Sequence, residues 1–159
     1  MAGKNKIKIN SFSIVKMEQT HANEVLRLAV KTQSSFRISE TESPSLFLQE
    51  NKNLILENIK HSFVYKDNKD KVFGAIIIQP ETNISAEILV LMDPNIIAGH
   101  EMYNEFKKLI SSLKFKSIFI KALKRRKNFE KYLNFSKFFG FSEVLNENEL
   151  FVILGFKKH

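Results

Sequence analysis

The alternation of apolar and polar positions divides the chain into strands and helices in a mixed order. Apolar runs predict strands at 12–16 (FSIVK), 84–92 and 117–122 (SIFIKA). Two more apolar runs flank a polar segment at 66–71, which predicts a hairpin. Apolar residues at helical spacing between Tyr103 and Leu113 predict a helix with one apolar stripe. The pattern therefore predicts an α/β (α+β) fold.

Two helices are predicted in the N-terminal half. Thr20 is a suitable N-cap for the first, which carries apolar residues between Val25 and Val30. Residues 31–42 are polar without a clear period and predict a loop. A Ser-Pro pair at 43–44 supplies a cap and a first-turn proline for a second helix that runs to about residue 59.

A helix and a hairpin are predicted in the C-terminal part of the chain. The basic turn LKRRKN leads into a predicted helix from Phe129 to Phe139, and Gly140 occupies the C′ position that ends it. A last hairpin is predicted from 141–144 and 149–155, turning through LNEN.

Composition limits the possibilities. A chain of 159 residues predicts a single domain over 1–159, with a short basic N-terminal tail over about 1–10. Cysteine is absent, which excludes disulfides, thiolate metal sites and a cysteine nucleophile. The four histidines are scattered without metal-ligand spacing, so no metal site is predicted.

No apolar run approaches the roughly 18 residues of a spanning helix, and the N-terminus lacks the apolar stretch of a secretion signal. We therefore expect no membrane insertion and a cytoplasmic location. The formal charge of +8 is compatible with polyanionic partners, but a solvated basic surface is the simpler explanation, because most of the charge is Lys spread along the chain.

The stretch LMDPNIIAGHEM, residues 91–102, runs from a strand through a turn into a helix. The first amides of a helix have no internal partners and can hold a phosphate. This stretch has one glycine, Gly99, and it places the acidic residue Glu101 where the helix begins.

In this order, the elements and three short motifs resemble the GNAT-type N-acetyltransferase superfamily from about Phe12 to Phe156. KVFGAIII, with Gly74, is similar to that family's third strand, and AEILVLMDP to its fourth strand and the start of its acetyl-CoA motif. FSKFFGF is similar to the end of its fourth helix. The resemblance implies a mixed central sheet of about six to seven strands flanked by about four helices. It also implies parallel strands at 84–92 and 117–122 that diverge near Asp93 and Ala122.

What the resemblance implies for function is acetyl transfer from acetyl-CoA to an amine acceptor of unknown identity. The acceptor would approach from the side of the 31–42 loop and the last hairpin. The implied cofactor-binding residues lie around the turn at 91–102 and in the basic turn: Leu91, Met92, Ile97, Ala98, Gly99, His100, Glu101, Arg125, Arg126 and Asn128.

The catalytic candidates are Glu87, Tyr132 and Ser136. Glu87 lies where the family often has a carboxylate base, although an edge position on the sheet explains it as well. Ser136 stands where the family has a thiolate-protonating Tyr, and Tyr132, one helical turn earlier, is either a substitute or a packing residue.

Alternatives also stay open for the other implied residues. Asn128 is suitable as a helix N-cap, and the basic turn could bind a CoA phosphate, bind nucleic acid or simply be solvated. Glu101 would repel a pyrophosphate unless it points away from it.

Two functions therefore remain. The first is a divergent acetyl-CoA-dependent N-acetyltransferase, which the preserved order of elements favours. The second is a non-catalytic binding or structural module, as a homo-oligomer or within a larger assembly such as a phage particle or regulatory complex. The missing glycines and the missing Tyr favour this second function, under which the chain could be a virion component.

Overall fold

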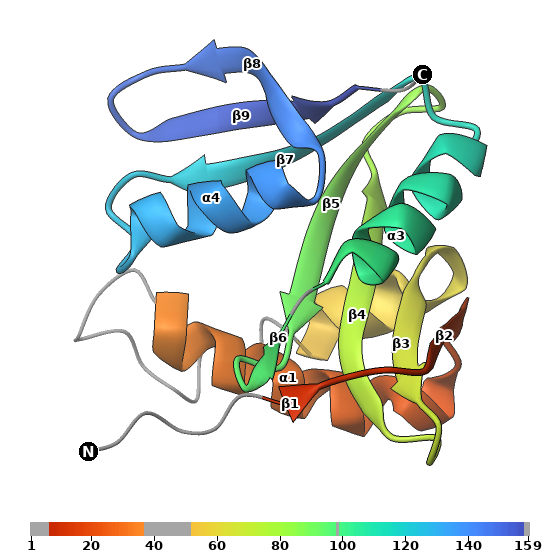
Figure 1. Cartoon of the computed structure of the whole chain (residues 1–159). Coiled ribbons are helices and arrows are strands. Elements are labelled where there is room, and N and C mark those ends of the chain that lie inside the picture. Colours follow the sequence, from red (N-terminus) through yellow and green to blue (C-terminus); the bar gives the residue numbers. More distant parts are fainter. Residues whose placement is uncertain (1–6, 37–51, 98, 158–159) are drawn as a thin grey trace, which may run out of the picture. The chain divides into compact units, whose positions relative to one another are not determined.

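The computed structural model describes residues 7–36, 52–97 and 99–157. A helix covers residues 52–57. The other elements, shown in Figure 1, are β1 (Ile7–Lys8), β2 (Phe12–Lys16), η1 (Gln19–His21), α1 (Ala22–Phe36), η2 (Ile59–His61), β3 (Phe63–Asp67), β4 (Val72–Pro80), β5 (Ser85–Met92), β6 (Ile96–Ile97), α3 (His100–Ser112), β7 (Ser117–Leu123), α4 (Phe129–Phe138), β8 (Phe141–Glu147) and β9 (Phe151–Phe156). Among the described helices, none is long and apolar enough to cross a membrane.

A seven-stranded sheet has the order β2-β3-β4-β5-β7-β9-β8. The pairs β2–β3, β3–β4, β7–β9 and β8–β9 are antiparallel, whereas β5 and β7 are parallel. The predicted mixed sheet and the predicted parallel pair are therefore confirmed. The β5–β7 ladder joins only the starts of the two strands, from Ser85↔Ser117 to Glu87↔Phe119.

The chain forms two compact units. The first contains β1, β2, α1, β3 and β6, together with β4 up to Ile77 and β5 from Leu89. The second contains the remaining parts of β4 and β5, followed by α3, β7, α4, β8 and β9. Every site residue described below belongs to one unit or the other.

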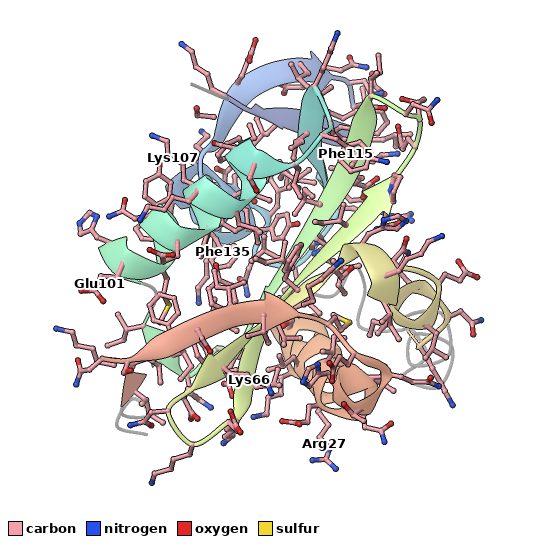
Figure 2. All side chains as sticks on the ribbon, turned by 90° about the vertical axis from the view of Figure 1, so that its right-hand side faces the viewer. Arg27, Lys66, Glu101, Lys107, Phe115 and Phe135 are labelled. Carbon is pink, nitrogen blue, oxygen red and sulfur yellow. The ribbon has the colours of Figure 1, made fainter. Side chains whose placement is uncertain are left out.

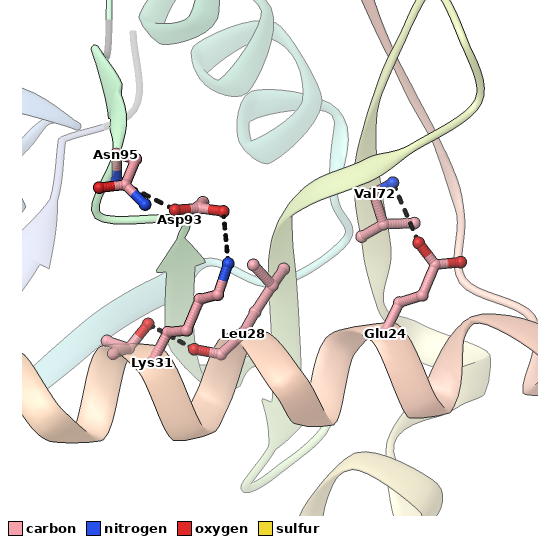
Figure 3. Close-up of polar contacts among 7 residues, drawn as sticks. Glu24, Leu28, Lys31, Val72, Asp93 and Asn95 are labelled. Atoms are coloured by element: carbon pink, nitrogen blue, oxygen red, sulfur yellow. Dashed lines mark hydrogen bonds and ion pairs between the residues drawn. The ribbon is translucent and has the colours of Figure 1, made fainter. Parts of the chain in front are cut away.

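In the first unit, α1 covers one face of the sheet. Its apolar side joins strand residues in a buried core of Met17, Val25, Leu28, Ala29, Ile55, Val64, Val72, Ala75, Ile77 and Leu91. Two polar contacts hold the same helix, because Glu24 accepts a hydrogen bond from the Val72 N–H and Lys31 forms an ion pair with Asp93 (Figure 3).

The helix boundaries differ from those predicted. Thr20 does not cap α1, because it lies inside the short helix η1, whose N-cap is Glu18. The Glu18 N–H donates to Nδ1 of His21 at 2.9 Å, and this reciprocal cap starts the helical turn two residues early. Residues 31–36 continue α1 rather than forming a loop, while 37–51, with the predicted Ser-Pro cap, lie outside the described residues.

In the second unit, aromatic rings fill the core between α3, α4 and the last two strands. Phe106 of α3 lies within 5.1 to 6.1 Å, centroid to centroid, of Phe139, Phe141 and Phe156. Gly140 ends α4 with a φ of +96°, which confirms its predicted C′ role. A side chain there would also collide with the ring of Phe156.

Strand β1 pairs with β6 in a small parallel sheet (Figure 1). Strand β1 lies within the segment that was predicted as the N-terminal tail. Ile7 lies opposite Ile96, and the Ile7 N–H donates to the Asn95 carbonyl at 2.7 Å. Two alternating residues are too few to predict a strand, because the period of two needs at least four positions to be recognised.

Candidate active site

Glu87 lies on β5 in the second unit, one residue after the buried Ala86 and one before the buried Ile88. Burial alternates along the first part of β5, so one face of the strand is more accessible there. Glu87 is half-buried and pairs in register with Phe119 of β7. Burial raises the pKa of its carboxyl, the charge of Glu81 raises it further, and Lys121 opposes both.

Tyr132 and Ser136 lie one turn apart on α4, and both are buried. Burial raises the pKa of the Tyr132 phenol, and the nearby charge of Glu87 also raises it, against the effects of Arg126 and Ser136. The Ser136 hydroxyl donates to the Tyr132 carbonyl at 2.9 Å. Its proton is therefore engaged within the helix, which makes Tyr132 the better proton donor of the two.

The basic turn lies between β7 and α4. Arg126 places its guanidinium carbon 4.8 Å from the centre of the Tyr132 ring, and its Nε is buried without a hydrogen-bond partner among the described residues. Arg125 is exposed. Asn128 occupies the N-cap position of α4 but adopts the left-handed conformation, with φ 60° and ψ 37°, and its side chain makes no capping hydrogen bond.

The start of α3 carries the glycine and the acid of the predicted phosphate turn. Gly99 is the N-cap in an extended conformation, and no side chain caps the helix there. A Cβ at Gly99 would meet no atom within 4 Å, so packing in the described chain does not require a glycine. Glu101 lies in the first turn on the surface (Figure 2), and His100 beside it is also exposed.

The other implied cofactor residues belong to the first unit. Leu91 and Met92 are buried near the end of β5, where they approach Gly74 so closely that any larger residue there would crowd them. Ile97 pairs with Lys8 through β6 and is exposed. Ala98 lies outside the described residues.

The structure brings together four of the implied site residues in the second unit, namely Glu87, Tyr132, Ser136 and Arg126. The residues of the implied phosphate turn are divided between the two units.

Lys121 was missed by reasoning from the sequence. It lies on β7, two residues after Phe119 and so on the face of Glu87, and its charge acts on that carboxylate. Lys121 could have been found by the same sequence feature that identified Glu87, namely a charged residue inside an apolar strand. Among the described residues, no group of three or more His, Asp or Glu could hold a metal ion.

Comparison with known proteins finds similar solved structures but no similar sequences. No family model matches the sequence, and no curated protein matches it either. The fold is similar to a GNAT-family acetyltransferase from Bacillus cereus, with 13% identity, 94% of this chain and 99% of that chain covered, and a TM-score of 0.65. It is also similar to Ard1 from Thermoplasma volcanium, with 17% identity, 93% and 99% coverage, and a TM-score of 0.60.

A third similar structure is a variant of the spermidine N-acetyltransferase SpeG from Vibrio cholerae, with 15% identity, 91% and 92% coverage, and a TM-score of 0.59. These matches span nearly the whole of this chain and of each neighbour. The chain has the fold of the GNAT-type N-acetyltransferases.

Proposed function

We propose that this protein is an N-acetyltransferase that uses acetyl-CoA to acetylate an amine. The observation that carries the proposal is the proximity of Glu87 and Tyr132, because the carboxylate lies near enough to raise the pKa of the phenol. A proton acceptor and a proton donor are the two groups that acyl transfer to an amine needs. Proteins with this fold include named N-acetyltransferases, which supports the same activity here.

Each group has a distinct task. Glu87 takes the proton that the amine loses as its nitrogen bonds to the acyl carbon. Its raised pKa makes it a stronger base than an ordinary glutamate. Tyr132 gives a proton to the sulfur as the carbon–sulfur bond breaks, and its raised pKa keeps the phenol protonated until then. Acetyl-CoA, when bound, supplies the thioester.

The start of α3 fits a phosphate-bearing ligand. Among the described residues, none lies within 4 Å of where a Cβ of Gly99 would be, and no side chain caps the first amides of the helix. The exposed position of Glu101 reduces its conflict with a phosphate, because water screens a surface charge. Arg125, exposed in the basic turn, would add a cation for the same ligand.

The non-catalytic alternative has less support. A scaffold needs neither an uncapped helix start nor a carboxylate beside a buried phenol, and each of these costs stability that a better cap or an apolar pair would recover.

Calorimetric titration with acetyl-CoA is the first test. We expect a dissociation constant below about 1 mM, which corresponds to a binding free energy of at least about 4 kcal/mol. Weaker binding, together with no release of free thiol in the presence of an amine mixture, would refute the proposal. Arg125→Ala should weaken CoA more than the neighbouring control Lys127→Ala if Arg125 contacts a phosphate.

A further inference from the structure

The second unit has an open face on its sheet. We define the open face by Glu87 of β5, Phe119 and Lys121 of β7, and Phe151 and Ile153 of β9. The registers Glu87↔Phe119 and Lys121↔Ile153 put these side chains on one side of the sheet. All are half-buried or exposed, whereas the alternate residues Ile118, Ile120, Ala122, Val152 and Leu154 are buried on the other side.

Lys121 is the cation of the open face. Its Nζ lies 4.4 Å from the centre of the Phe151 ring, a contact that holds the ammonium along the sheet. Within the described part of the chain it forms no ion pair. The neighbouring Lys124, by contrast, is already paired with Glu147 at 2.9 Å.

The charges of the open face are arranged as a complement to a zwitterion. Glu87, with Glu81 near it, supplies negative charge at one end. Lys121 supplies positive charge farther along β7, and two residues of strand plus one strand spacing separate the Cα atoms of Glu87 and Lys121 by roughly 8 Å. Phe119 offers apolar surface beside Glu87, and Ile153 offers it beside Lys121.

We propose that the open face selects an acceptor whose amine is accompanied by an anionic group and an apolar group, as in an apolar amino acid, rather than a polyamine. This inference rests on the proposed acetyl transfer and names its acceptor class. The amine would meet Glu87, the anionic group would meet Lys121, and the apolar group would lie on Phe119 and Ile153. A polyamine would bring a second cation to Lys121, where it is repelled.

The test compares kcat/KM for L-phenylalanine, L-phenylalaninamide and spermidine. Phenylalaninamide keeps the amine and the ring but lacks the carboxylate. We expect phenylalanine to be the best of the three. Lys121→Gln should lower the ratio of phenylalanine to phenylalaninamide about threefold to tenfold, mainly through KM for phenylalanine. Because the two amines differ in basicity, the contribution of Lys121 is measured by how this ratio changes from one protein to another.

Lys116→Gln is the matched control. Lys116 is exposed just before β7 and is not on the open face. Its substitution by Gln removes the same charge as Lys121→Gln. Its ratio should equal that of the natural protein. A second readout needs no turnover, because NMR titration of Glu87 should show a higher pKa in Lys121→Gln than in Lys116→Gln.

The outcomes separate this inference from the proposed function. An equal ratio in Lys121→Gln and Lys116→Gln, or a natural preference for spermidine, would overturn the acceptor class and leave acetyl transfer standing. Binding of acetyl-CoA without transfer to any of the three amines would also overturn it. Failure to bind acetyl-CoA at all would refute the proposed function, and this inference with it.

Discussion

Among single residues, burial acts in the same direction on Glu87 and Tyr132 but with different chemical results. It raises both pKa values, which strengthens the carboxylate as a base and keeps the phenol as an acid. Under the proposed mechanism, burial would thus prepare Glu87 to accept a proton and Tyr132 to donate one.

This environment predicts the pH dependence of activity. Glu87 must be ionised to accept a proton, so kcat/KM should fall as the pH drops through its pKa, which lies above the ordinary 4.5. Glu87→Gln should abolish that acidic limb and lower kcat/KM about a hundredfold or more. An unchanged acidic limb in Glu87→Gln would assign the base to another group.

Tyr132→Phe tests the acid. The ring and its contact with Arg126 remain, while the phenol is lost. We expect kcat to fall about a hundredfold with little change in acetyl-CoA affinity, measured by steady-state kinetics and calorimetry. Tyr103→Phe, on α3 beside Phe138, is the matched control and should leave kcat unchanged. Equal effects of the two substitutions would make Tyr132 a packing residue only.

Glu101 tests the start of α3 as a phosphate site. Its carboxylate interacts favourably with the helix dipole, which stabilises the helix by about 0.3 to 1 kcal/mol, but it would repel an anion bound at the same amides. Glu101→Gly should therefore tighten acetyl-CoA binding and lower the free energy of unfolding. Weaker acetyl-CoA binding in the variant would mean that Glu101 is turned away from the phosphates.

For whole elements, the turn after β5 is held by one carboxylate. Asp93 accepts the Asn95 N–H at 3.0 Å through Oδ1 and pairs with Lys31 of α1 at 3.1 Å through Oδ2 (Figure 3). Burial alone would raise the pKa of Asp93, but these hydrogen bonds and the charges of Lys31 and Lys71 lower it below its ordinary 3.8. The carboxylate therefore stabilises the fold whenever it is ionised in both folded and unfolded chains.

Asp93→Asn should lower the free energy of unfolding by about 1 kcal/mol near neutral pH, a modest value because Lys31 is half-exposed. The deficit should be constant from about pH 5 to 8 and should shrink below about pH 4, as the natural carboxyl becomes protonated in the unfolded chain and then in the folded one. Urea denaturation across this pH range measures it. Glu105→Gln, which breaks the exposed pair with Lys108, should change little; an equal deficit there would contradict this account.

The end of α4 depends on Gly140. An added Cβ would lie 2.6 Å from Cε2 of Phe156, and the φ of +96° is unfavourable for any other residue. Gly140→Ala should lower the free energy of unfolding by about 3 kcal/mol, measured by urea denaturation. Gly99→Ala is the matched control, since its Cβ would enter open space, and it should cost less than about 0.5 kcal/mol. Equal costs would contradict both the collision with Phe156 and the backbone strain at residue 140.

At the level of the whole molecule, periodicity was sufficient to predict most of the strands and helices, and the family resemblance supplied the mixed sheet and the parallel pairing of β5 with β7. Periodicity failed where a few residues decide a boundary. The His21 side chain caps a turn that begins before Thr20, and β1 is too short to show a period. The single domain predicted over 1–159 stays a prediction, and one cooperative unfolding transition would support it.

The candidate site could be predicted only in part, for a physical reason. Glu87 and Tyr132 each stood out as a polar group among apolar neighbours, but whether two such groups meet depends on register and on the packing of α4. Lys121 was missed because its relation to Glu87 arises from the pairing of two strands that lie more than 30 residues apart in the sequence. The same limit applies to Ser136, whose hydroxyl turned out to be engaged with its own helix.

The pairing of β1 with β6 has a kinetic consequence. Two residue pairs close a loop of roughly 90 residues, so their formation carries a large entropic cost with few contacts to offset it. Such a contact should form late in folding and open without global unfolding. In hydrogen–deuterium exchange, the Ile7 amide should therefore exchange much faster than the amides of β4, and each opening would release the Asn95 carbonyl that precedes α3.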